Sequence, residues 1–222
     1  APASADVTLR QVTRGMGPGM TATGTTYIKG LRMRTDTVLG GTTRTVVFDL
    51  VGQRQISYDS TRQDAEVFDL SGLPPMPDLR VTVSIAGTAW VVRDAPGAAE
   101  WAAFYRAVAE RGWAFGDPRA IRGNPAQARS MAELYRQMAE TGGIAYETTL
   151  SVSMQAEGPM AREYPPPPPG QSTTRVDDVS TATLDDALFD ELFRLHLKNV
   201  YALCGVLPPA VRLTASETCE RA

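Results

Sequence analysis

Hydrophobic and polar residues alternate through the first third of the chain. In residues 31–36, for example, Leu31, Met33 and Thr35 alternate with charged residues, which is the period of a strand with one buried face. Short turns rich in glycine, aspartate and serine separate such segments. The pattern predicts an antiparallel meander with strands over residues 7–12, 21–29, 31–36, 42–50, 53–58 and 63–70.

Strand character returns in three later segments. Residues 81–92 are apolar and interrupted at Gly87, so they fit either one strand or a pair of strands in a hairpin. Residues 145–156 and 172–183 contain several threonines and valines, which favour strands. The sequence therefore predicts further strands over residues 145–156 and 172–183.

The hydrophobic period changes to that of a helix in two segments. The first runs over residues 98–111, and the second begins at Asn124-Pro125 and ends at Gly142-Gly143. Each has apolar residues at i, i+3, i+4 and i+7, which share one helical face. These residues are Trp101, Phe104, Tyr105 and Val108, then Met131, Leu134, Tyr135 and Met138. A third helix is expected over residues 184–203.

Length and charge favour one exported domain without nucleic-acid partners. The 222 residues fit a single domain, and the net charge of -3 includes no basic cluster of the kind that neutralises phosphates. No apolar run reaches the roughly 20 residues needed to span a bilayer. The small residues of segment 1–5 resemble the start of a chain after signal-peptide cleavage. We therefore expect a periplasmic or secreted protein with residues 1–5 as a tail.

The candidate chemical groups do not combine into a catalytic or metal centre. His196 is the only histidine, and Cys204 would lie about 12 Å away along a helix, too far for a nucleophile–base pair. Two thiols and one imidazole cannot complete a structural zinc site. The acidic residues near 185–191 fit the beginning of a helix. We expect no enzyme activity and no cofactor.

The two cysteines, Cys204 and Cys219, leave two alternatives open. In an oxidising compartment they can form a disulfide that closes a short loop, which would stabilise the fold by about 3 kcal/mol. Two free thiols in a loose tail fit the spacing equally well.

A set of short segments occurs in a fixed order along the chain: Lys29–Asp36, Val47–Asp49, Pro96–Glu100 with Phe104-Tyr105, Met131–Tyr135 and Glu157–Ala161. Together they resemble a family of secreted bacterial proteins of unknown function. The similarity extends over roughly residues 20–190 and stops there. The tail over residues 190–222, with both cysteines and the histidine, has no counterpart in the resemblance.

That family is similar in fold to the lipoprotein-localisation carriers LolA and LolB. The resemblance implies an α+β fold, in which a curved antiparallel sheet forms an incomplete barrel around two amphipathic helices. It also implies a cavity for a lipid or a lipoprotein acyl chain, and the apolar helix faces supply its candidate lining. The alternative is a structural or interaction protein of the envelope with a filled core. The candidate ligand-binding residues are Trp90, Trp101, Phe104, Met131, Leu134 and Met138.

Overall fold

A computed structural model describes residues 6–15, 19–61, 65–70, 80–113, 125–157 and 169–189. Within these ranges the chain forms one nine-stranded antiparallel sheet and two α-helices, an α+β architecture dominated by strands. The strands are β1 (Val7–Arg14), β2 (Thr21–Lys29), β3 (Arg32–Leu39), β4 (Thr42–Asp49), β5 (Arg54–Asp59), β6 (Glu66–Asp69), β7 (Arg80–Val92), β8 (Ile144–Glu157) and β9 (Gly170–Ser180).

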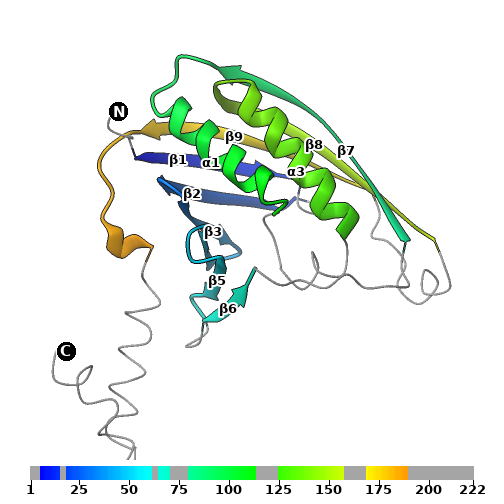
Figure 1. Ribbon diagram of the computed structural model, residues 1–222, viewed down its shortest axis with the longest axis horizontal. Helices are drawn as coiled ribbons and strands as arrows, with labels where there is room; N and C mark the ends of the chain where they lie inside the picture. Colours follow the sequence, from blue (N-terminus) through cyan, green and yellow to red (C-terminus); the bar gives the residue numbers. More distant parts are fainter. Residues whose placement is uncertain are drawn as a thin grey trace, which may run out of the picture.

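The strand order shows which parts of the chain become neighbours. It is β6-β5-β4-β3-β2-β1-β9-β8-β7, so β1 to β6 form the meander that the sequence predicted. The last described strand, β9, pairs with β1 and also with β8, and thereby joins the meander to the antiparallel β7–β8 pair (Figure 1). The sheet stays open, with β6 and β7 at its edges.

Strand β7 resolves the two alternatives for residues 81–92. It is one continuous strand over Arg80–Val92, paired with β8 along its length. Gly87 lies opposite Leu150, and a Cβ atom at Gly87 would come within 2.7 Å of Leu150 Cδ2. The glycine therefore makes room for a neighbouring side chain and does not form a turn.

The two helices lie side by side over one face of the sheet (Figure 1). They are α1 (Ala98–Glu110) and α3 (Pro125–Glu140), close to their predicted bounds. Gly97 caps α1 with a φ of 76°, a left-handed conformation that favours glycine. A Cβ there would lie 2.5 Å from Val7 Cγ2, so this glycine lets the start of α1 approach β1 closely.

The main hydrophobic core lies between the helices and the sheet. On the sheet side, Val7, Ile28, Met33 and Phe48 follow one another across β1 to β4 in register. Each is buried, and they belong to the same core cluster as the buried face of α1. The α1 residues of this cluster are Ala98, Trp101, Phe104, Ala107 and Val108.

A second, smaller core covers the opposite face of the sheet. Val47 and Ile56 point away from the helices because neighbouring residues of a strand face opposite sides. Phe189, only 2% exposed, packs on both of them. It ends a segment over residues 184–189 that follows β9 and lies against this face.

Polar contacts hold the 184–189 segment in place. The Lys29 ammonium donates to the Leu184 carbonyl at 2.7 Å, and the Leu184 amide donates to Asp6 Oδ2 at 2.7 Å. Asp186 pairs with Arg32 and, at 3.3 Å, with Lys29. Hydrogen bonds from Arg32 and Lys29 hold the pKa of Asp186 below its ordinary value.

The expected helix from residue 184 is replaced, in its described part, by a single 3₁₀ turn over Asp186–Leu188. The Asp185 carboxylate accepts from the Ala187 amide at 2.9 Å and caps this turn. The pairing of Asp186 with two basic residues of the sheet holds the backbone against the strands. Residues 1–5 and 190–222, including His196, Cys204 and Cys219, lie outside the described residues.

We predict that Phe189→Ala lowers the free energy of unfolding by about 3 kcal/mol, because it opens a cavity over Val47 and Ile56. Urea denaturation followed by circular dichroism measures this loss. Val51→Ala is the control, since Val51 is 72% exposed and should change stability by less than about 0.5 kcal/mol. A loss as small as that of the control would show that the segment does not stabilise the fold.

Candidate ligand-binding cavity

A cavity of about 360 Å³ lies between the two helices and the sheet. Its volume falls within the range of roughly 300–1,000 Å³ that is usual for small-molecule sites. Both helices contribute to its lining, and so do six strands, β1 to β4, β8 and β9. The cavity therefore depends on segments from almost the whole described chain.

The helix side of the cavity is aromatic and thioether-rich. Trp101 and Tyr105 stack on α1 with ring centroids 4.3 Å apart, and Tyr105 meets Tyr135 of α3 at 5.4 Å. Met131 and Met138 adjoin them, and methionine adapts its shape to varied apolar partners. The helix-side lining residues are Trp101, Tyr105, Met131, Leu134, Tyr135 and Met138.

The sheet side of the cavity mixes apolar and uncharged polar residues. The apolar lining residues are Leu9, Met33, Val46, Phe48, Ala145, Leu150 and Val176. The polar ones are Gln11, Thr26, Thr35, Thr148 and Thr174.

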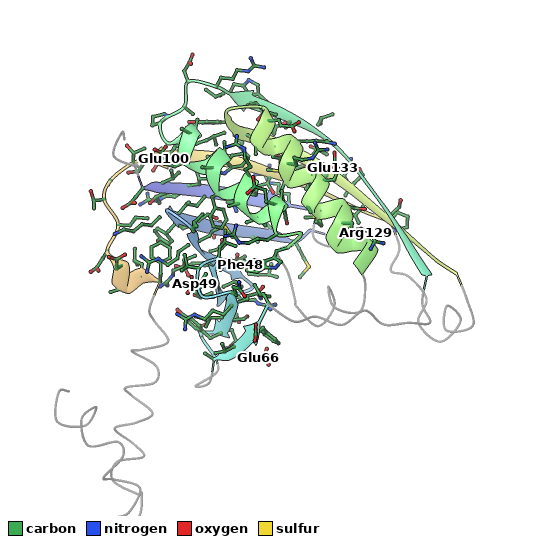
Figure 2. All side chains as sticks on the ribbon, viewed as in Figure 1. Phe48, Asp49, Glu66, Glu100, Arg129 and Glu133 are labelled. Atoms are coloured by element: carbon green, nitrogen blue, oxygen red, sulfur yellow. The ribbon has the colours of Figure 1, made fainter. Side chains whose placement is uncertain are left out.

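The charged side chains of α3 lie away from the cavity lining. Arg129 and Glu133 are exposed on this helix (Figure 2). Arg136 donates to Glu133 at 2.6 Å and approaches Glu140 at 3.3 Å, forming an ion-pair network along the outer face. These hydrogen bonds hold the pKa of Glu133 below its ordinary value. The helix thus separates a charged outer face from an apolar inner face.

Tyr105, which lines the cavity, has a perturbed ionisation. Burial raises the pKa of its phenol to about 12, because the phenolate would lose its hydration. The ring is packed against Trp101, Phe104 and Tyr135. The phenol therefore remains uncharged throughout the physiological pH range.

The structure places the six candidate ligand-binding residues in three environments. Trp101, Met131, Leu134 and Met138 line the cavity. Phe104 has no exposed surface and belongs to the core beside Tyr105.

Trp90 lies in a different place from the other five candidates. It is 65% exposed, contacts Tyr146 at 5.8 Å between ring centroids, and is not among the lining residues. Trp90 is in register with Glu147 of β8, whereas the lining residues Thr148 and Leu150 occupy the alternate positions of that strand. Strand alternation therefore turns Trp90 to the face opposite the cavity.

Sequence reasoning missed the contribution of the sheet to the cavity. The threonines of residues 21–37 and 145–174 read as ordinary strand formers. Their period of two predicts which of them share a face, but strand order decides which of them meet. In particular, Thr174 reaches the cavity because β9 lies between β1 and β8.

In the described part of the chain, no cluster of three or more histidine, cysteine, aspartate or glutamate residues is suited to a metal ion. None of the described helices is both long and apolar enough to cross a membrane.

Comparison with known proteins gives no assignment for the cavity. No protein-family model matches the chain, and no curated protein sequence matches it significantly. The candidate site is therefore defined by the cavity and its lining.

We predict that one of the seven tyrosines ionises near pH 12, whereas ordinary tyrosines ionise near 10. Tyrosinate absorbance during alkaline titration measures this, and Tyr105→Phe should remove the late component. The unfolded chain releases the Tyr105 proton near pH 10, whereas the folded chain keeps it to about pH 12. The contribution of Tyr105 to the free energy of unfolding is therefore complete below about pH 10 and decreases as the pH rises toward about 12. A late component that persists in Tyr105→Phe would contradict the assignment.

Proposed function

We propose that the protein binds a hydrophobic ligand, such as a lipid or a lipoprotein acyl chain, in the cavity between the sheet and the helices. The observation that carries this proposal is the cavity of about 360 Å³, lined on its helix side by Trp101, Met131, Leu134 and other apolar residues. Transfer of an acyl chain from water into the cavity favours binding by about 25 cal/mol for each Å² of apolar surface buried.

The chemistry of the lining also favours binding over catalysis. The described lining residues include no acid, base or thiol, and Tyr105 keeps its proton up to about pH 12. General acid–base and nucleophilic catalysis need such groups within hydrogen-bonding reach of the substrate. We propose a non-enzymatic carrier or sensor.

We further propose that the chain has a fold of the LolA/LolB type and acts in the periplasm or outside the cell. Two observations support this: the motif resemblance over roughly residues 20–190, and an open antiparallel sheet with two helices on one face. Carriers of that type shelter acyl chains between sheet and helices, the position of the cavity in this chain.

We predict that the uncharged fluorescent probe N-phenyl-1-naphthylamine binds the protein and that Leu134→Trp weakens this binding about tenfold or more. Leu134 lines the cavity, and the larger indole would occupy ligand space. The increase in fluorescence of the directly excited probe measures the affinity. Gln137→Trp is the matched control, because it places the same side chain on the exposed face of the same helix.

Native mass spectrometry after mild purification provides an independent check, in which bound lipid should add mass to the chain. Protein that is free of lipid and does not bind the probe would contradict the proposal. It would favour the alternative of an envelope interaction protein with a filled core.

A further inference from the structure

The sheet side of the cavity, called the cavity floor below, changes in polarity along strand β1. Val7, Leu9, Gln11 and Thr13 lie two residues apart and face the helices. The first two are buried and apolar, whereas Gln11 and Thr13 are partly buried and polar. Moving along this strand therefore leads from the hydrophobic core to a floor that can form hydrogen bonds.

The neighbouring strands add two hydroxyls beside Leu9, because their residues are in register. Beside Leu9 lie Thr26 on β2 and then Thr35 on β3. Their hydroxyls are hydrogen-bonded at 3.3 Å, and both residues line the cavity.

A second hydroxyl row crosses the sheet further along. Thr13 on β1 pairs with Thr174 on β9, which pairs with Thr148 on β8. The Thr13 and Thr174 hydroxyls are 3.0 Å apart, and Thr174 and Thr148 line the cavity.

These hydroxyls retain capacity for a ligand. A hydroxyl has one donor and two acceptor positions, so a bond between two threonines uses one of their two donors. In each pair of hydrogen-bonded threonines, one O–H group and several oxygen lone pairs remain for a further partner. Gln11 adds an amide, which can both donate and accept. The floor can therefore form hydrogen bonds with an alcohol, an ester or an amide group of a ligand.

An ionised ligand group would find no counter-charge among the described lining residues, all of which are uncharged. Burying a carboxylate without a partner costs far more than burying a neutral polar group. Arg44 is in register with Thr37 on the helix-covered face, but it is exposed, lies outside the lining and contacts Ser57.

We propose that the ligand of this cavity is an uncharged amphiphile, with an apolar chain against the helices and an alcohol, ester or amide group on the threonine floor. This inference rests on the proposed function, that the cavity binds a hydrophobic ligand. It predicts that the cavity binds neutral amphiphiles more tightly than ionised fatty acids.

Competition against N-phenyl-1-naphthylamine tests the proposal with decan-1-ol and decanoate, which share one chain length. At about pH 8 we expect decan-1-ol to bind at least about tenfold more tightly. Decanoate should gain affinity as the pH falls toward the ordinary carboxyl pKa, because protonation removes the buried charge.

Substitution of the floor provides the second measurement. The double variant Thr148→Val, Thr174→Val keeps the branched shape but removes two hydroxyls, so it should weaken decan-1-ol severalfold more than it weakens the apolar probe. Thr173→Val is the matched control: Thr173 lies on the same strand but faces the other side of the sheet, where its hydroxyl meets that of Thr149 at 3.1 Å.

Three results would overturn the inference. The first is an affinity for decanoate at about pH 8 that equals or exceeds the affinity for decan-1-ol. Loss of that decanoate binding in Arg44→Gln would show that Arg44 supplies the counter-charge. The second is an equal loss of decan-1-ol affinity in the floor variant and the Thr173→Val control. Failure of the probe and both amphiphiles to bind would overturn the proposed function as well, which separates the two failures.

Discussion

The pairing of β9 with β1 is the contact on which the rest of the structure depends. It joins the meander, whose strands are close together in sequence, to the antiparallel β7–β8 pair, whose strands are separated by both helices. Without it, the two parts would each expose an edge, and the helices would have no continuous surface to cover. The pairing also contains a bulge between Arg10 and Gln11, beyond which Val176 and Thr174 face the cavity.

The two faces of the sheet have separate roles. One face holds the main core and the cavity, whose described lining residues are uncharged. The other carries Lys29, Arg32 and Arg34, which bind the 184–189 segment through its carbonyls and Asp186. Since strand residues alternate in direction, concentrating these charges on one face keeps the other face free of them.

This separation underlies the proposal that the cavity binds a ligand. A cavity with an apolar helix side and a hydroxyl-bearing floor can hold an uncharged ligand with no buried charge to compensate. Its helix side combines rigid rings, such as Trp101, with adaptable methionines, such as Met131. The floor is part of a hydrogen-bonded sheet, so its polar groups are held in place before a ligand arrives.

Local pattern in the sequence determined the elements. Alternation identified the meander strands, the i, i+3, i+4 and i+7 pattern identified both helices, and flanking residues such as Gly97 marked the beginning of α1. These features arise from interactions within a few residues, and they place Trp101, Met131, Leu134 and Met138 on inward helix faces.

Only the tertiary structure decided which elements meet. The position of β9 between β1 and β8, the exposure of Trp90 beside a bulge and the threonine rows of the floor all depend on contacts between residues distant in the chain. A period of two indicates that Thr174 and Val176 share a face, but it carries no information about the strand beside them. That neighbour is selected by the burial of the whole sheet against the helices, which no single segment encodes.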